Sequence, residues 1–211
     1  MPGATLNTGW KSPTANENAT GGVSYPEKSY TSDNNRTLIA DAAGQYYDLK
    51  TFGFSIPAGA SINGILVSVE MSSANPPQKG AFQIKMSYDG GSNWSSTSST
   101  QTTTSGTDAY FNVGGATDTW GRAWSQSEFS DANFRVRVLG NSTEAEATTN
   151  IDHVRVKVWY TDPSTPIDDG SICYASDGRK AGEGAGSGTG VLVFYDGSNY
   201  IACDTGTTVQ A

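Results

Sequence analysis

The chain offers few side chains that could do acid–base or nucleophilic chemistry. Its single histidine, His153, follows Asp152 at the start of an alternating run of apolar and polar residues. A catalytic His–Asp pair needs a nucleophile within reach, and adjacent residues of a strand point to opposite faces. We therefore interpret His153 as a structural or exposed histidine, and Asp152 as a residue that bonds nearby backbone N–H groups.

Two pairs of carboxylates are the other candidates for catalysis. Glu144 and Glu146 flank Ala145 in a polar stretch, and Asp168 and Asp169 follow a proline-rich stretch. Glycoside hydrolysis needs two carboxylates held about 5–9 Å apart in a cleft, and nothing in the sequence forces that arrangement. The spacing also differs from that of an EF-hand calcium loop. We therefore expect no enzyme activity, no catalytic residues, no cofactor and no bound metal.

The two cysteines and a glycine-rich run also suggest no chemistry. Cys173 and Cys203 cannot form a zinc site by spacing with one histidine in the chain. They either pair in an oxidising compartment or, as we favour, are two small buried apolar residues. The glycine-rich run at 182–190 is not followed by Lys-Ser/Thr, so it is not a P-loop. It is instead a flexible loop or an arm that reaches a neighbouring subunit.

Aromatic side chains among polar neighbours are the candidates for binding. Their rings combine an apolar body with a polar edge and are favoured as anchors of interfaces. The candidate binding residues are Trp10, Tyr25, Tyr30, Trp94, Trp120, Trp124 and Trp159. The run S-Y-D-G-G-S-N-W at 87–94 resembles the Asp-box hairpin of sialidases. Because it occurs once, we interpret it as a stable turn with a packed tryptophan.

Strands must position these side chains. From 154 to 160, three valines and Tyr160 alternate with Arg155, Lys157 and Trp159, which is typical of a half-buried strand. Clusters of Gly, Asn, Asp and Pro separate many such runs, and no stretch shows a sustained helical period. We therefore predict an all-β fold, with an antiparallel jelly-roll-like β-sandwich followed by a small C-terminal β module.

The same patterns divide the chain into four parts. We expect an irregular N-terminal segment at 1–45, a β-sandwich at 46–162, a linker at 163–171 and a small antiparallel β module with the glycine-rich loop at 172–211. The N-terminal segment is a candidate anchoring arm, because an extended arm can add a strand to a neighbour's sheet. Whether it is donated to a neighbour stays open. The Ser/Thr-rich run at 95–106 is either a loop or a solvated edge strand.

Charge and hydropathy argue against nucleic acid and membranes as partners. A net charge of -8 and a pI near 4.5 disfavour nonspecific binding to nucleic acid. No apolar run approaches the ~18 residues of a membrane span. The first residues show neither the basic nor the apolar region of a secretory signal, so we expect synthesis in a cytoplasm.

Several runs resemble tailed-bacteriophage virion proteins. The runs are F-G-F-S-I-P-A-G-A-S-I-N-G-I-L-V-S-V-E at 52–70, W-S-Q-S-E-F-S-D-A-N-F-R-V-R-V at 124–138 and I-D-H-V-R-V-K-V-W-Y-T at 151–161. The tail at 174–197, closing on 203–211, is similar to a C-terminal module of phage head-fibre or tail-fibre proteins. The resemblance implies a jelly-roll-like sandwich exposed on a virion that is assembled in a host bacterial cytoplasm.

We therefore expect a virion structural protein, either a capsid decoration protein or a head fibre, that acts by protein–protein binding. Its partners would be the major capsid protein or other virion proteins, and we expect a homo-oligomer, with a trimer as one option. The alternative is a tail-fibre or receptor-binding module for host attachment. Its loops at 89–106 and 140–149 would then contact a host surface glycan. A carbohydrate-active enzyme is the least favoured hypothesis.

Overall fold

A computed structural model describes the chain in several stretches. These are residues 5–40, 44–144 and 146–162, together with the backbone of three strands at 172–175, 191–195 and 200–202. The chain divides into one unit over 5–162 and a second unit that contains the three C-terminal strands. The described residues are all-β, with two short 3-10 helices, η1 (Pro26–Ser29) and η2 (Gln126–Phe129).

One layer of the first unit is a six-stranded antiparallel sheet in the described part of the chain, here called sheet A. Its strands are β1 (Thr5–Asn7), β3 (Val23–Ser24), β4 (Thr37–Ala40), β6 (Ser61–Ser73), β9 (Ala109–Gly114) and β11 (Thr148–Thr161). The order is β3-β4-β11-β6-β9, and β1 also pairs with β11. The two longest strands, β6 and β11, therefore form its centre.

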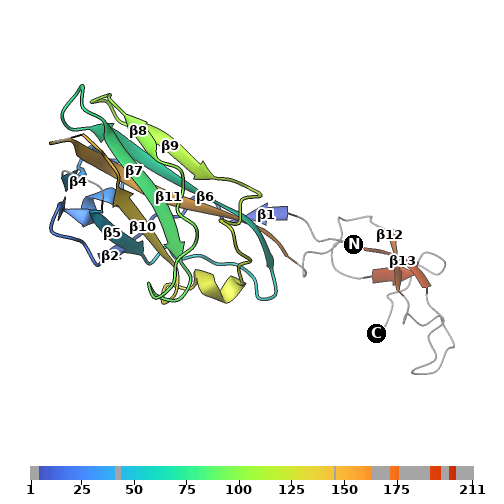
Figure 1. The fold of residues 1–211 in the computed structure, drawn as a ribbon. Coiled ribbons are helices and arrows are strands. Elements are labelled where there is room, and N and C mark those ends of the chain that lie inside the picture. Colours follow the sequence, from blue (N-terminus) through green and yellow to red (C-terminus); the bar gives the residue numbers. More distant parts are fainter. Residues whose placement is uncertain are drawn as a thin grey trace. The chain divides into compact units, whose positions relative to one another are not determined.

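The second layer, sheet B, has five described strands in the order β2-β5-β10-β7-β8. They are β2 (Ala15–Glu17), β5 (Tyr46–Lys50), β7 (Gly80–Ser87), β8 (Gln101–Thr103) and β10 (Arg135–Gly140). Figure 1 shows β7 and β10 of this sheet lying across β6 and β11 of sheet A, with η2 at one end of the sandwich. The expected antiparallel β-sandwich is confirmed.

The core lies between the two sheets and is built by the expected alternation. Val154, Val156 and Val158 are fully buried, whereas Arg155 and Lys157 between them lie on the outer face of sheet A. One end of the core is a cluster of rings in stacked, tilted and edge-to-face contact, formed by Phe52, Phe54, Trp124, Phe129 and Phe134. Such contacts add to the apolar burial that holds two sheets together.

The N-terminal segment differs from the irregular arm expected for residues 1–45. Strand β1 pairs with β11 of sheet A, and β2 pairs with β5 of sheet B. Strand β4 also pairs with β11, so residues 5–40 contribute to both layers of their own sandwich. Each of these strands is only three or four residues long. That length is too short for an alternating pattern to appear in the sequence.

The C-terminal unit contains β12 (Ile172–Ala175), β13 (Val191–Tyr195) and β14 (Tyr200–Ala202). They form an antiparallel sheet in that order. The linker at 163–171, the glycine-rich loop at 182–190, Cys203 and the Cys173 side chain lie outside the described residues, so the predictions made for them stay predictions. In the described part of the chain, no helix has the length and apolarity to cross a bilayer.

Candidate functional site

The seven aromatic residues predicted to bind a partner do not form one cluster. Trp10 and Trp159 contact the same cation, Lys157, on the outer face of sheet A. Trp94 packs against Arg137 of sheet B. The remaining four lie near η1 or in the loop that precedes η2.

Trp120 and Trp124, two of the candidate binding residues, are largely buried. Their side chains are only 6% and 7% exposed and belong to the core. The Trp124 indole N–H donates to the Thr119 carbonyl at 2.8 Å, and its ring packs on Phe129. The loop folds inward because these rings bury more apolar surface than any polar neighbour could. Trp124 is therefore a core residue.

Tyr25 and Tyr30 flank η1 in different environments. Tyr25 is exposed, with the Lys28 ammonium 4.5 Å from its ring centre. The Tyr30 hydroxyl accepts a hydrogen bond from the Asn16 amide at 2.5 Å, and its ring packs against the core. Tyr30 thus joins η1 to β2.

A cavity of about 320 Å³ opens between strand β9 and the Ser/Thr-rich run. The run lies along β7, where the Ser95 and Ser98 backbone N–H groups donate to the Met86 and Ile84 carbonyls. Only its centre, at 101–103, is a strand, so it is part loop and part solvated edge. The cavity is lined by Ser96, Thr97, Ser98, Ser99, Val113, Gly114, Asp118, Trp120 and Gly121.

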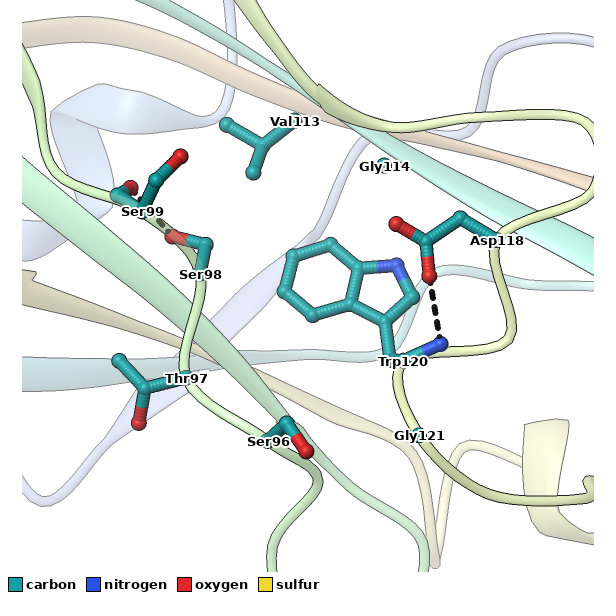
Figure 2. Close-up of a pocket in the computed structure, with 9 residues that line it drawn as sticks. All are labelled: Ser96, Thr97, Ser98, Ser99, Val113, Gly114, Asp118, Trp120 and Gly121. Carbon is teal, nitrogen blue, oxygen red and sulfur yellow. Dashed lines mark hydrogen bonds between the residues drawn. The ribbon is translucent and has the colours of Figure 1, made fainter.

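Trp120 is held rigidly in this cavity. Its indole N–H donates to the Ile65 carbonyl at 3.0 Å, and its backbone N–H donates to an Asp118 carboxylate oxygen at 2.8 Å. Figure 2 shows the indole in the middle of the cavity, with Asp118 on one side and the run from Ser96 to Ser99 on the other. A fixed ring facing several hydroxyl groups suits a small ligand that has both apolar and polar surface.

The outer face of sheet B carries a cation held between two rings. The Arg137 guanidinium carbon lies 3.8 Å from the Tyr46 ring centre and 4.0 Å from the Trp94 ring centre. Its Nε and Nη2 atoms donate to the two carboxylate oxygens of Asp48 at 2.6 and 2.7 Å. Asp48 is fully buried, so this pair is a closed structural unit.

The outer face of sheet A carries rings and cations in alternation, which we call the sheet A ladder: Tyr110, Arg155, Trp10, Lys157 and Trp159. The Arg155 guanidinium carbon is 4.1 Å from the Tyr110 ring centre and 4.3 Å from that of Trp10. The Lys157 ammonium is 4.5 Å from the Trp10 ring centre and 5.7 Å from that of Trp159. Tyr110 was missed at the sequence level, although its place in a short alternating strand indicates an outward side chain.

His153 adjoins this ladder in a structural role. Its Nε2 atom is 2.8 Å from the Ser12 hydroxyl, and its Nδ1 atom is 3.0 Å from the Tyr110 hydroxyl. Burial first, and then the positive charge of Arg155, lower the pKa of His153 below its usual 6.5. Asp152 lies at a β-bulge between the paired residues Ile151 and His153 and is buried, and burial raises its pKa.

Glu144, one of the candidate carboxylates, is paired with Lys79. Glu144 accepts the Lys79 backbone N–H at 2.7 Å and lies 3.5 Å from the Lys79 ammonium. Among the described residues, no three His, Cys, Asp or Glu side chains are grouped to hold a metal ion. Asp168 and Asp169 lie outside the described residues.

No family model and no curated protein matches this chain. Among solved structures it is similar to Clostridium thermocellum endo-1,4-beta-D-xylanase 10B in complex with xylohexaose (TM-score 0.39, 11% identity, 72% of this chain and 28% of that chain). It is also similar to TmCBM61 in complex with beta-1,4-galactotriose (TM-score 0.33, 15% identity, 71% of this chain and 88% of that chain). A third similar structure is the N-terminal cellulose-binding domain of Cellulomonas fimi beta-1,4-glucanase C (TM-score 0.31, 12% identity, 75% of this chain and 91% of that chain).

The chain spans 28% of the length of the xylanase structure and most of the length of the other two.

Proposed function

We propose that this chain is a non-catalytic glycan-binding β-sandwich, and that the cavity at Trp120 receives one sugar unit of a host surface glycan. The observation that carries the proposal is the rigid indole of Trp120 opposite the hydroxyl side chains of Ser96 to Ser99. A pyranose ring has an apolar C–H face and an edge of hydroxyl groups, and the cavity offers a counterpart to each.

The chemistry of each wall supports this ligand. The electron-rich face of an indole attracts the weakly positive C–H groups of a sugar. Serine and threonine hydroxyls both donate and accept hydrogen bonds, so they can match sugar hydroxyls in either sense. The carboxylate of Asp118 adds a charge-assisted acceptor. A volume of about 320 Å³ is at the small end of ligand sites, which suits a single sugar unit.

The proposal is tested by blocking the cavity from its exposed rim. Ser96 is exposed, and no hydrogen bond from its hydroxyl holds the fold in the described part of the chain. Ser96→Tyr places a ring in the cavity without disturbing the core. Thr104→Tyr, in the same Ser/Thr-rich run but outside the cavity, is the matched control. Both variants and the wild type are screened on an array of bacterial surface polysaccharides.

We expect the wild type and Thr104→Tyr to bind the same glycans. Ser96→Tyr should bind them at least about tenfold more weakly, which corresponds to the loss of about one hydrogen bond to the sugar. Binding by all three proteins alike would contradict the cavity as the site. Failure of the wild type to bind any glycan would contradict the function.

We also propose that the sandwich is displayed on a phage particle, as a capsid decoration protein, a head fibre or a tail component. The support is the sequence resemblance of 52–70, 124–138 and 151–161 to virion proteins. Many weak sites on one particle would raise the effective affinity for a cell surface. Mass spectrometry of purified particles tests this proposal, and absence of the chain would contradict it. Separated heads and tails show which part carries it.

A further inference from the structure

The sheet A ladder contains a cation that has rings on both sides but no carboxylate. Among the described residues, neither Arg155 nor Lys157 forms an ion pair or a side-chain hydrogen bond. The Nε atom of Arg155 is buried without a hydrogen-bond partner. A guanidinium group has five N–H donors in a planar fork that matches a carboxylate. The ladder therefore has donors to offer to an outside anion.

The outer face of sheet B shows the same unit with the carboxylate in place. Arg137 lies between Tyr46 and Trp94, and two of its N–H groups donate to Asp48 at 2.6 and 2.7 Å. Arg155 also lies between a tyrosine and a tryptophan, at similar distances. The two faces thus share one arrangement of an arginine between two rings, with a carboxylate beside Arg137 only.

The difference comes from the residue on the neighbouring strand. Asp48 of β5 is the cross-strand partner of Arg137, whereas Ser68 of β6 is the cross-strand partner of Arg155. Ser68 is fully buried, and its hydroxyl has no hydrogen-bond partner among the described residues. A serine is too short to reach the guanidinium and carries no charge. Sheet A therefore has no carboxylate directly across from Arg155, and the Glu70 carboxylate on this face lies opposite His153 instead.

We infer that the sheet A ladder binds a sugar unit that carries a carboxylate, such as a uronic or sialic acid unit of an acidic polysaccharide. The carboxylate pairs with the terminal N–H groups of Arg155, because the Nε atom is buried, and Lys157 supplies a second positive charge. The C–H face of the sugar packs on Trp10 and Tyr110, which are 37% and 38% exposed. The ligand class rests on the proposed glycan binding, but the site is separate from the Trp120 cavity.

The charge on this face favours a single carboxylate over a polyphosphate. Glu70 lies on the same face, opposite His153, and adds a negative charge there. The net charge of the chain is -8, which repels a nucleic acid at long range. Two local cations flanked by exposed rings can still pair with an isolated carboxylate, because that pairing acts over a few ångströms.

Binding of the full chain to immobilised polygalacturonate, alginate and polysialic acid tests the inference. Methyl-esterified polygalacturonate is the matched probe, because it keeps the sugar chain and removes the charge. Arg155→Gln removes the fork, and Ser68→Asp supplies an internal carboxylate that competes with the ligand. Lys85→Gln is the matched control, because Lys85 also lies over a tryptophan, Trp94, but on sheet B.

We expect at least one acidic polysaccharide to bind, more weakly as salt is added, and the esterified polymer not to bind. Arg155→Gln and Ser68→Asp should each lose about tenfold or more, as expected for a hydrogen bond to a charged group. Lys85→Gln should bind as the wild type does. If Ser68→Asp does not fold, Arg155→Lys replaces it, and an intermediate loss is expected because the charge stays but the fork is lost.

Four results would overturn the inference: no acidic polysaccharide binds, Arg155→Gln binds as well as the wild type, the esterified polymer binds equally, or single-stranded DNA or dextran sulfate binds as tightly. The cavity variant Ser96→Tyr separates this inference from the proposed function. It should keep acidic polysaccharide binding on the ladder while losing binding at Trp120. Failure at one site is therefore distinguishable from failure at the other.

Discussion

Arg137 and Arg155 occupy matching places on the two outer faces of the sandwich, but only Arg137 has a carboxylate partner. Each guanidinium lies between a tyrosine and a tryptophan, within 4.3 Å of both ring centres. Asp48 closes the pair on sheet B, and Ser68 leaves the corresponding place on sheet A without a charge. The ion pair on sheet B therefore stabilises the fold, whereas the Arg155 guanidinium on sheet A keeps N–H donors that can bind a ligand.

This relationship predicts unequal stability effects. Asp48→Ala should lower the free energy of unfolding by about 3–5 kcal/mol, because it leaves a largely buried arginine without its anion. Arg155→Gln should cost about 1 kcal/mol, since only partly exposed cation–π contacts are lost. Urea denaturation of both variants provides the measurement. Equal losses would contradict the distinction between the two faces.

The lowered pKa of His153 predicts a pH dependence of stability. The unfolded chain binds a proton near pH 6.5, whereas the folded chain binds it only at lower pH. The contribution of His153 to the free energy of unfolding is therefore fully present above about pH 6.5, and it is lost as the pH falls through the pKa of the folded state. Urea denaturation at about pH 7.5 and about pH 5.5 should show a larger loss for the wild type than for His153→Gln.

The variant His153→Gln also serves as the control for other groups. Carboxylates with altered pKa, such as Asp152, titrate in both proteins and cancel in the difference. An identical pH dependence in the two proteins would show that His153 is not the titrating group.

Gly114 is predicted to be essential for the Trp120 cavity. Its φ is +86°, and an added Cβ would lie 2.2 Å from the Ile65 carbonyl oxygen and 2.7 Å from the Trp120 Nε1 atom. Gly114→Ala should cost about 2 kcal/mol or more and shift the indole, because both backbone strain and a clash result. Gly115→Ala is the matched control, since nothing lies within 4 Å of its added Cβ.

Denaturation and tryptophan fluorescence of the two glycine variants test this prediction. An unchanged fluorescence spectrum and stability in Gly114→Ala would show that the close packing of β9 on Trp120 does not hold the cavity.

The long strands could be predicted from the sequence because their pattern is local. The alternation at Val154, Val156 and Val158 repeats over enough residues to identify both the strand and its buried face. The strands β1 and β2 could not be predicted, because a run of three residues is too short to show a period. Their pairing depends on contacts with β11 and β5, which are distant in the sequence.

The candidate sites could be predicted only in part. Trp10, Trp94, Trp120 and Trp159 were chosen as binding residues from their polar surroundings, but that choice gives no information on which rings share a face. The burial of Trp124 depends on a loop that folds over the end of the sandwich, and no local pattern encodes this. The partner-free state of Arg155 depends on Ser68, which lies far away in the chain and one strand away in the sheet.

Binding of a sugar unit in the Trp120 cavity can be followed by heteronuclear NMR titration of the chain with an oligosaccharide of the glycan selected on the array. If the cavity binds a sugar unit, the backbone amide signals of Ser96 to Ser99 and the indole signal of Trp120 should move together as the sugar is added. The Trp124 indole signal, which belongs to the core, should stay in place. Signals that move only outside the cavity, or no change at saturating sugar, would contradict the account.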